Sequence, residues 1–469
     1  MRTGERESAI EALVPGVANA RVGVPGEPDV TAEALGAAAD ADAREAAVRP
    51  TEEERIGASL VDYFQWEDED VFGKARAFAG YLAEIRARQH DLYRRTLVSS
   101  SGHRVHIRDP FTGQVREMVM MASNNYLGLT SHPRVVEAAV RATREYGAGA
   151  GSVPLLAGTM SIHRQLEERL AAFKGCEDAM VFAAGYAGNL GALAGLLRPG
   201  DLVVNDILNH ASIVDGCRMS GATSKVFPHL NLRALERILE RAQGEFRGKM
   251  VVVDGVFSMD GDIAPLPELI TICRRHGARL MIDEAHATGV IGKHGRGTPE
   301  YWGVEGQVDV VFGTLSKALG GVGGFVASRR EVIDYLRIFA RPYMFSTALP
   351  PAVTASVLAA LDVVETEPEL REQLWDNIRY LTGNLRALGF NLGNAQTAIV
   401  PLIIGDDYKV NEMARRLHEL GIFVNPVFYP AVSRKLSRVR LSVMATHTRE
   451  DLDLTLEACA RAGRELGVI

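Results

Sequence analysis

Apolar segments of the sequence end in polar residues whose types could do chemistry together. Asp283 ends one apolar run and His286 follows it, while Lys317 comes just after a second run. Ser258 follows a third run, and a glycine-rich stretch, 320–324, comes directly after Lys317. A lysine amine can form an imine with an aldehyde, a carboxylate can keep a ring nitrogen protonated, and glycines leave room for a phosphate. These groups are the ones that a pyridoxal-phosphate (PLP) site requires, with Lys317 bonded to the cofactor and Asp283 facing its pyridine nitrogen.

Each of these residues has an ordinary explanation when it is taken alone. An acid at the end of a strand is often a helix cap, and most lysines are solvated. The arrangement favours chemistry, because Asp283 and Lys317 lie thirty-four residues apart at the ends of two successive predicted strands. Ligands of open α/β sheets bind beyond the carboxyl ends of the strands, where both side chains would lie.

The middle of the chain alternates short apolar runs with longer amphipathic segments. Runs rich in Val, Ile and Met predict buried strands at 179–184, 202–205, 250–254, 280–283 and 308–313. Helical periodicity predicts helices at 232–241, at 266–276 and from Ile162 to a stop at Gly175. This alternation indicates an α/β fold with a large, mainly parallel sheet that helices cover on both faces.

Composition divides the chain into four parts. Residues 1–60 lack aromatic residues and carry twelve acids against six arginines, which predicts an acidic, flexible tail. Residues 61–146 open with an amphipathic stretch and are expected to form an N-terminal arm and the start of a dimer-contacting segment. Residues 147–349 are expected to form the large PLP-binding domain, and residues 350–469 a smaller C-terminal α/β domain.

Charge and cysteine content limit the classes of function and location. A net charge of -7 argues against nucleic acid as a partner, since phosphate-tracking surfaces need a basic excess. The N-terminus lacks a secretory pattern, and the four cysteines have no CxxC spacing, which suits reduced thiols and no metal site. Residues 179–197 are uncharged but contain four glycines and Asn189, which favours a buried strand, turn and helix over a membrane span. We therefore expect a cytoplasmic protein with no membrane-spanning segment.

Longer motifs around these residues resemble a known family. They read DEAHATG at 283–289, TLSKALGG at 314–321 and NHAS at 209–212. These motifs are similar to those of the α-oxoamine synthases. These are PLP enzymes of fold-type I that include 8-amino-7-oxononanoate synthase, glycine C-acetyltransferase and serine palmitoyltransferase. The similarity runs from about residue 122 to 467. It implies an aspartate-aminotransferase-like α/β fold with a large and a small domain.

The resemblance also implies roles for single residues. The implied catalytic residues are Lys317, which moves protons at the substrate Cα, Asp283 at the pyridine nitrogen, His210 stacked on the ring, and His286. The resemblance also implies that Ser258 and His286 lie near the phenolic oxygen of the cofactor. The implied phosphate contacts are Gly185 and Tyr186 at a helix start, and the hydroxyl of Thr314.

Further matching positions concern the substrate and a second subunit. Ser346 and Thr347 match a phosphate contact that comes from the other subunit of a homodimer, and Asn124 matches a substrate contact near that interface. Arg440 matches the arginine that holds the amino-acid carboxylate, a task that suits the guanidinium fork. Arg438 is a weaker candidate on the same strand face, and either arginine could instead be solvated at a strand edge.

The implied activity is that of an acyltransferase. A small α-amino acid would condense with an acyl thioester, lose carbon dioxide, and give an α-amino ketone and a free thiol. The thioester would be an acyl-CoA or an acyl group on a carrier protein, for which residues 61–100 are a candidate docking surface. The alternatives are a PLP aminotransferase of the same fold and a non-catalytic partner subunit. The presence of Lys317, Asp283, His286 and His210 together argues against the second alternative.

Overall fold

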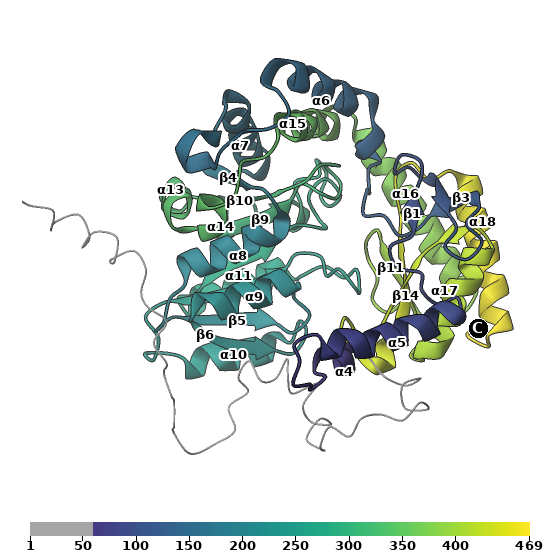
Figure 1. The fold of residues 1–469 in the computed structure, drawn as a ribbon. Helices are drawn as coiled ribbons and strands as arrows, with labels where there is room; N and C mark the ends of the chain where they lie inside the picture. The colour runs from purple at the N-terminus through teal and green to yellow at the C-terminus, as the bar shows by residue number, and fades with distance from the viewer. Residues whose placement is uncertain (1–59) are drawn as a thin grey trace, which may run out of the picture.

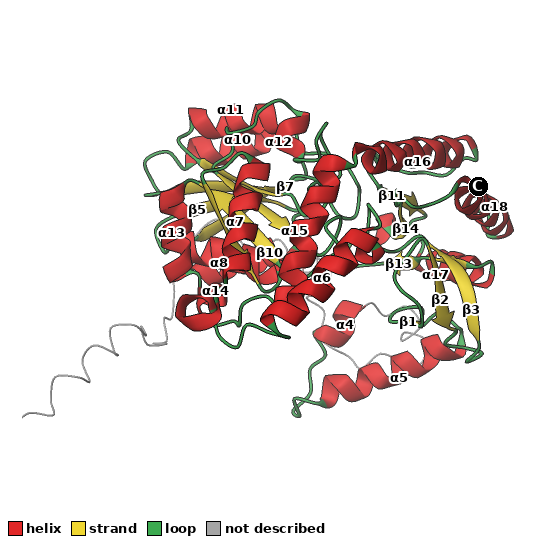
Figure 2. Ribbon diagram, turned by 90° about the horizontal axis from the view of Figure 1, so that it is seen from above, coloured by secondary structure: helices red, strands yellow, loops and turns green. Residues whose placement is uncertain are grey.

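The computed structural model describes residues 60–469 (Figure 1). The acidic tail expected at residues 1–60 therefore lies, except for its last residue, outside the described part of the chain. Seen from above, the large domain and the small domain lie side by side (Figure 2).

A seven-stranded sheet forms the centre of the large domain. In spatial order its strands are β4 (Asp178–Phe182), β10 (Gly324–Ser328), β9 (Val310–Thr314), β8 (Arg279–Asp283), β7 (Lys249–Asp254), β5 (Leu202–Asp206) and β6 (Thr223–Phe227). β10 runs antiparallel to both of its neighbours, and the other pairs are parallel. The predicted large, mainly parallel sheet is confirmed.

The inner strands of this sheet are mostly apolar because both faces of the sheet are buried. Along β7, Val251 and Val253 pack into the core that α10 (Leu232–Arg241) and α11 (Leu266–Arg275) share, while Val252 packs into the core on the opposite face. The helices of that opposite face are α8 (Gly185–Leu196), α9 (Ala211–Ser220), α13 (Arg330–Phe339) and α14 (Arg341–Met344).

Helix ends follow local chemistry. α7 (Ser161–Lys174) stops at Gly175, whose φ of 65° lies in the left-handed region that favours glycine. Asn231 caps α10 by accepting a hydrogen bond from the amide of Ala234 at 3.1 Å. The stop at Gly175 was predicted from the sequence for this reason. The helix at 232–241 was predicted from its periodicity alone, and Asn231 had not been singled out.

The small domain is built on a second sheet. Its strands, in order, are β11 (Ile399–Ile403), β14 (Arg438–Ser442) and β13 (Asn425–Val427), and β14 pairs antiparallel with both neighbours. The helices that pack with them are α16 (Pro368–Ala387), α17 (Asp407–Glu419) and α18 (Arg449–Glu465). α15 (Pro351–Thr366) packs instead on α7 and on α6 (Pro133–Tyr146) of the large domain. A short helix, α12 (Thr298–Tyr301), follows β8.

A third sheet joins the N-terminal segment to the C-terminal part of the chain. Its strands are β1 (Thr96–Leu97), β2 (Arg104–Arg108), β3 (Val115–Met120) and β12 (Ile422–Phe423). β12 pairs parallel with β3, so that Ile422 lies opposite Val119. Residues 96–120 are therefore part of the small domain in space, although they lie far from it in sequence.

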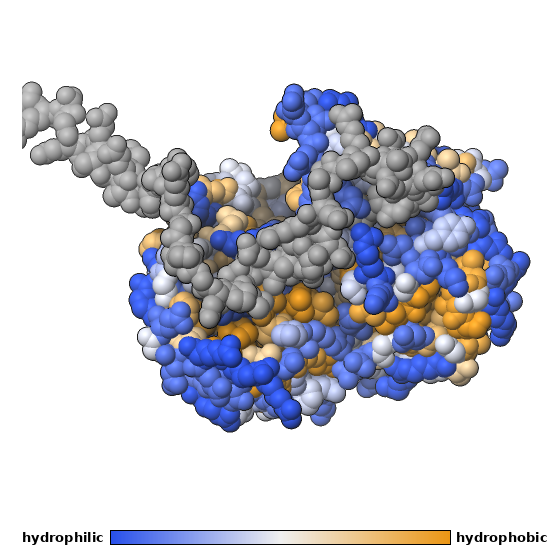
Figure 3. Space-filling view, turned by 90° about the horizontal axis from the view of Figure 1, so that it is seen from below, coloured by the Kyte–Doolittle hydropathy of each residue, from blue (hydrophilic) through white to orange (hydrophobic). Residues whose placement is uncertain are grey.

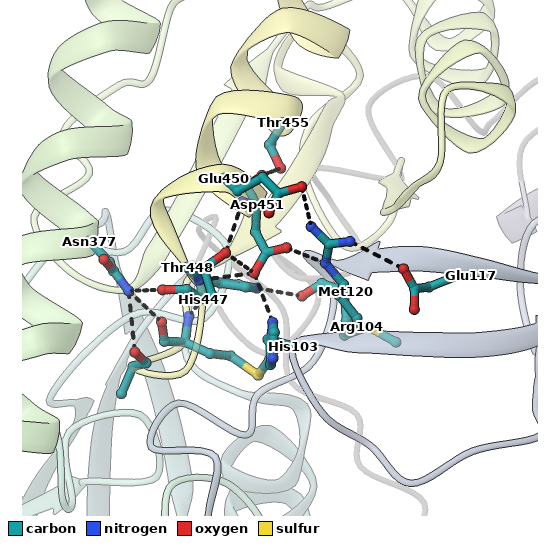
Figure 4. A network of polar contacts seen from close by, with 12 residues as sticks. His103, Arg104, Glu117, Met120, Asn377, His447, Thr448, Glu450, Asp451 and Thr455 are labelled. Atoms are coloured by element: carbon teal, nitrogen blue, oxygen red, sulfur yellow. Dashed lines mark hydrogen bonds and ion pairs between the residues drawn. The ribbon is translucent and has the colours of Figure 1, made fainter.

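A polar network fixes this junction (Figure 4). Asp451, fully buried near the start of α18, accepts hydrogen bonds from His103 Nδ1 at 2.7 Å and from Arg104 Nε at 2.6 Å. His447 Nε2 contacts the carbonyl of Met120 at 3.0 Å. These contacts hold the chain directly before Asn124, for which the family resemblance implies a substrate contact.

The predicted amphipathic arm consists of α4 (Leu60–Phe64) and α5 (Gly73–Ala87). Aromatic rings join the two helices, with the Tyr63 centroid 5.5 Å from that of Phe78 and 5.1 Å from that of Tyr81. Beyond α5, His90 pairs with Glu412 of α17 at 2.6 Å, which anchors the arm on the small domain.

The surface combines hydrophilic and apolar regions. Figure 3 shows one face on which hydrophilic residues predominate and apolar residues gather in patches. Among residues 60–469, no helix is both long enough and apolar enough to cross a membrane.

Candidate active site

A cavity of about 190 Å³ lies at the carboxyl ends of β7, β8 and β9. Parallel pairing puts Asp254 at the end of β7 directly opposite Asp283 at the end of β8. The cavity is lined by Gly185, Tyr186, Asn189, His210, Ser212, Asp254, Val256, Ser258, Asp283, Ala285, His286, Phe312, Thr314, Ser316 and Lys317. The fold therefore gathers eight of the candidate site residues that the sequence singled out around one space.

Lys317 and Asp283 line this cavity together. Burial lowers the pKa of Lys317 from its ordinary value, which favours the neutral amine. The carboxylate of Asp283 is 4% exposed and accepts a hydrogen bond from the amide of Ala285 at 2.8 Å. Its other oxygen accepts a hydrogen bond from Asn189 Nδ2 at 2.7 Å. A buried carboxylate held in this way suits a protonated ring nitrogen as its partner.

Asn189 is a site residue to which the sequence reasoning assigned no role. It lies on α8, is 1% exposed, and donates from Nδ2 to Ser212 Oγ at 2.9 Å as well as to Asp283. Ser212 Oγ in turn contacts Nδ1 of His210 at 2.7 Å. One chain of hydrogen bonds therefore orients both the acid and the histidine. The signal was present, since Asn189 is the one amide side chain in the uncharged stretch 179–197.

Asp254 was also missed as a site residue, although its strand was predicted. Its carboxyl is 3% exposed and accepts a hydrogen bond from the amide of His210 at 3.3 Å. Burial, together with the nearby carboxylate of Asp283, raises the pKa of Asp254 well above its ordinary value. The raised pKa favours the neutral form of Asp254.

The first turn of α8 forms a cradle suited to a phosphate. α8 begins at Gly185 and Tyr186, and no side chain caps its N-terminus. The amides of a first helical turn have no partner within the helix, and they attract anions. A Cβ added at Gly185 would lie 2.8 Å from Thr314 Oγ1, so glycine is required for this close approach. Gly185, Tyr186 and Thr314 are thus brought together as the resemblance implied.

His286 is linked to the N-terminal segment through Tyr126. The phenol of Tyr126 contacts His286 Nδ1 at 2.7 Å and donates to Asn124 Oδ1 at 3.2 Å. Burial, with the positive charges of Lys317 and Arg440, lowers the pKa of His286 well below its ordinary value. The imidazole of His286 is therefore neutral at physiological pH. Tyr126 had not been singled out in the sequence.

The two arginines of β14 have different environments. Arg440 donates from Nε to the carbonyl of Ser258 at 2.7 Å and from NH2 to Asn124 Oδ1 at 3.2 Å, and it remains partly exposed. Arg438 is 1% exposed and donates to the carbonyl of Met259 and to Asp260, each at 2.8 Å. β14 is the central strand of its sheet, so neither arginine is solvated at a strand edge. Arg440 remains the better candidate for a substrate carboxylate.

Ser346 and Thr347 do not line this cavity. They follow Phe345, which is 67% exposed, and their segment is attached to the large domain through the amide of Ala348, which donates to the carbonyl of Ser152 at 3.0 Å. The role expected for Ser346 and Thr347 is a contact with the cofactor phosphate in the other subunit of a homodimer.

Known proteins are similar to this chain in sequence and in fold. The family model described as aminotransferase class I and II matches residues 116–458. An 8-amino-7-oxononanoate synthase from Symbiobacterium thermophilum is 47% identical over 354 residues, which cover 76% of this chain and 90% of that protein. The chain belongs to the aminotransferase class I and II family, among its α-oxoamine synthases.

Two further relatives of this α-oxoamine synthase cover more of the chain. A serine palmitoyltransferase from S. paucimobilis, solved with a PLP–myriocin aldimine, has a TM-score of 0.81 and 34% identity, and the match covers 86% of this chain and 100% of that one. A 4-hydroxy-2,2'-bipyrrole-5-methanol synthase from a Serratia species is 41% identical over 410 residues, 87% of this chain and 63% of that protein.

This α-oxoamine synthase depends on PLP and is an acyltransferase, as expected. The reaction class is the decarboxylating condensation of a small α-amino acid with an acyl thioester. Two of the named relatives are synthases and the third is a palmitoyltransferase, so the aminotransferase alternative is not supported. The residues fit the cofactor: Lys317 and Asp283 share one cavity with a helix N-terminus that suits a phosphate.

Proposed function

We propose that the cavity at the ends of β7, β8 and β9 is where this synthase joins a small α-amino acid to an acyl thioester. The observation that carries the proposal is that Lys317 and the buried carboxylate of Asp283 line the same cavity. PLP bound there supplies the electron sink for the electron pair released at the substrate Cα. The remaining tasks fall to side chains of this chain.

Lys317 takes the proton from the substrate Cα and returns it. Because burial lowers its pKa, the Lys317 amine is neutral, and able to accept a proton, over a wider pH range than a solvated lysine. With PLP bound in this cavity, Asp283 would stabilise positive charge at the ring nitrogen, and His210 and His286 would help to hold the ring.

Arg440 holds the carboxylate of the amino acid. Its Nε is already held by the carbonyl of Ser258, and its NH2 donates to Asn124, so the guanidinium is oriented before the substrate arrives. A carboxylate fixed by Arg440 would orient the substrate and so would select which bond at Cα breaks. Asn124 supports Arg440 and contacts the substrate in this arrangement.

The active site is shared between two copies of the chain in a homodimer. Large apolar side chains are exposed near the segment of Ser346 and Thr347, as expected of a surface that a second copy covers. They include Leu156, Val322, Ile338, Phe339 and Phe345. We infer that Ser346 and Thr347 reach the phosphate of the partner's site.

We also infer a cytoplasmic location. All four cysteines are free thiols, and Cys217, Cys273 and Cys459 are buried. Burial raises the pKa of each of these three thiols to about 12, so they are inert and suited to a reducing compartment.

A substrate matrix tests the proposed function. Glycine, L-alanine and L-serine are combined with acetyl-, octanoyl- and palmitoyl-CoA, and with the same acyl groups on a carrier protein. We expect release of free thiol and carbon dioxide that requires both substrates. Amino-group transfer to a keto acid without release of thiol would contradict the proposal. The preferred thioester would also identify the acyl donor.

A further inference from the structure

The loop between β7 and α11 is a compact structure that reaches from the large domain to the small one. Its ends are joined by the bridge between Val256 and Ile263, and the amide of Gly261 donates to the carbonyl of Phe257 at 2.9 Å. Gly261 has a φ of 76°, in the left-handed region, so the turn requires glycine. We call residues 256–263 the docking loop.

The docking loop contacts the small domain along β11 and β14, the strands that face the large domain (Figure 1). A Cβ added at Gly261 would collide with the carbonyl oxygen of Ile399, which shows how closely the loop approaches β11. Thr397 Oγ1 donates to the carbonyl of Gly261 at 2.9 Å. Arg438 donates to the carbonyl of Met259 at 2.8 Å. The position of the loop is therefore coupled to that of the small domain.

The docking loop also sets the direction of Arg440. Its Nε donates to the carbonyl of Ser258 at 2.7 Å, which is a backbone atom of the loop. A shift of the loop displaces this acceptor, and with it the guanidinium that holds the substrate carboxylate in the proposed function. Charge-assisted bonds to a carboxylate require close alignment.

On the side of the large domain, one histidine joins the docking loop to the sheet. His229 Nδ1 contacts Asp206 Oδ1 at 3.0 Å, and His229 Nε2 contacts Asp262 Oδ2 at 2.7 Å. Asp206, at the end of β5, is fully buried, and it also accepts hydrogen bonds from the amides of Leu208 and Leu230, each at 2.8 Å. These contacts fix the carboxylate of Asp206, and His229 connects this carboxylate to the docking loop.

The positive charge of the His229 imidazolium balances the negative charge of the Asp262 carboxylate. Asp262 is 6% exposed, and its Oδ1 is buried without a hydrogen bond. Burial disfavours a charged imidazole, but the hydrogen bonds with Asp206 and Asp262 prevail and raise the pKa of His229 to about 10. The imidazolium is therefore present at neutral pH. A buried carboxylate that loses its counter-charge is destabilised and tends to move toward water.

We propose that His229 is a positioning residue that fixes the docking loop, and through Ser258 the guanidinium of Arg440, for binding of the amino-acid carboxylate. This inference rests on the proposed function, since it assumes that Arg440 binds the carboxylate. It assigns His229 no contact with substrate or cofactor, and His229 does not line the cavity.

The first test measures binding of the amino acid to the holoenzyme. Glycine, L-alanine and L-serine are titrated while the visible absorbance of the bound cofactor is followed. We expect His229→Gln to raise the apparent Kd of the amino acid that binds wild-type protein by about tenfold, because a displaced guanidinium aligns poorly. The spectrum without amino acid and the KM for the thioester are expected to stay within about twofold of wild type.

A matched control removes a histidine–carboxylate pair elsewhere. His294 Nδ1 contacts Glu300 Oε1 at 2.5 Å, the His294 side chain is 57% exposed, and the pair lies outside the cavity. His294→Gln is expected to bind the amino acid like wild type. An unchanged Kd in His229→Gln, or the same rise in both variants, would overturn the inference.

Charge rescue and a double variant separate positioning from a merely structural role. Adding Asp262→Asn to His229→Gln removes the unbalanced buried charge and is expected to restore part of the affinity. Because His229 acts through Arg440, His229→Gln is expected to add little to the effect of Arg440→Ala, whereas independent roles would give additive losses. Full additivity would contradict the inference.

The Arg440→Ala variant distinguishes a failure of the proposed function from a failure of the positioning role of His229. If Arg440→Ala leaves amino-acid binding unchanged, the proposed role of Arg440 fails, and this inference fails with it. If Arg440→Ala weakens binding but His229→Gln does not, only the inference fails. Should His229→Gln not fold, Asp262→Ala breaks the same bridge without leaving an unbalanced carboxylate at residue 262, and the same rise in Kd is expected.

Discussion

At the residue scale, the site depends on how each ionisable group is surrounded. Asp283 and Asp254 lie opposite each other at the ends of adjacent strands, yet their surroundings favour different protonation states. Asp283 receives hydrogen bonds from Asn189 and from the amide of Ala285, which stabilise a carboxylate. Asp254 is buried beside that charge, which raises its pKa and favours its neutral form. These neighbours support the proposed role of Asp283 as the acid that faces the ring nitrogen.

The role of Asn189 gives a prediction at this scale. Asn189→Ala removes a 2.7 Å hydrogen bond to the charged Asp283. We expect the affinity of the apoenzyme for PLP to fall by about tenfold, the usual cost of losing a hydrogen bond to a charged group. The measurement is a titration of apoenzyme with PLP, followed by visible absorbance.

Asn205 provides the control for this prediction. Like Asn189 it is 1% exposed and has a buried Oδ1 without a hydrogen bond, but it lies on β5 outside the cavity. Asn205→Ala is expected to leave PLP affinity unchanged even if it lowers stability. Equal losses of affinity in both variants would show that Asn189 acts through packing alone.

The residues that the sequence revealed differ in kind from those it did not. Asp283 and Lys317 end apolar runs, so strand prediction and the position of ligands in α/β sheets sufficed to bring them together. Asn189 and Tyr126 lie in apolar or irregular parts of the sequence. The partner of Asn189, Asp283, is 94 residues away, and the partner of Tyr126, His286, is 160 residues away. No local pattern encodes such a contact.

At the element scale, the start of α18 shows how one side chain can join a helix to a distant sheet. Asp451 accepts a hydrogen bond from the amide of Thr448 at 2.9 Å, and the Thr448 hydroxyl accepts one from the amide of Asp451 at 3.2 Å, which closes a capping box. The same carboxylate binds His103 and Arg104 near β2. Thus one cap both starts α18 and anchors the segment that leads to Asn124.

The charge of Asp451 therefore stabilises the fold. Burial opposes this charge, but hydrogen bonds from Thr448, Arg104 and His103 outweigh burial and lower the pKa of Asp451 below its ordinary value. We expect Asp451→Asn to lower the free energy of unfolding at pH 7 by about 1–2 kcal/mol. The contribution of a group with a lowered folded pKa is complete above its unfolded pKa. The difference between variant and wild type should therefore shrink as the pH falls below about 4.

Denaturant unfolding at several pH values measures this difference. Asp406, the exposed cap of α17, accepts a hydrogen bond only from the amide of Lys409, at 2.9 Å, among the described contacts. Since Asn caps helices as well as Asp does, Asp406→Asn is expected to be nearly neutral. A loss in Asp451→Asn that is the same at pH 7 and pH 3 would contradict the electrostatic explanation.

Strands buried on both faces were the easiest elements to predict. The runs at 202–205, 250–254 and 280–283 correspond to β5, β7 and β8 within a residue or two. β6 was missed because Thr223, Ser224 and Lys225 interrupt its apolar pattern at the edge of the sheet. The pairing of β12 with β3 joins segments some 300 residues apart, which no local periodicity reveals.

At the scale of the whole molecule, residues of the large domain line the cavity, and Arg440 of the small domain contacts the backbone of one of them, Ser258. Helix α15 packs with the large domain, whereas α16 packs with α18 in the small domain. Arg440 comes from the small domain and Lys317 from the large one. The relative position of the domains therefore sets the distance between the two groups that we propose hold and deprotonate the substrate.

The shared site predicts complementation between inactive chains. One chain carries Lys317→Ala, and the other carries Ser346→Glu and Thr347→Glu, whose carboxylates repel a phosphate. In a mixed dimer with shared sites, one site receives wild-type residues from both chains, so about a quarter of wild-type activity is expected from random mixing. Mixed dimers that form but stay inactive would contradict the proposed sharing.

The most direct test of the account is to locate the covalent attachment of PLP. Holoenzyme is reduced with borohydride, digested, and its peptides are identified by mass spectrometry. We predict that the reduced cofactor is attached to Lys317. Lys317→Ala protein is expected to carry no cofactor label and to release no thiol. The control, a substitution of the exposed Lys293 by Ala, is expected to behave like wild type. Label on any other lysine, or normal turnover by Lys317→Ala, would contradict the account.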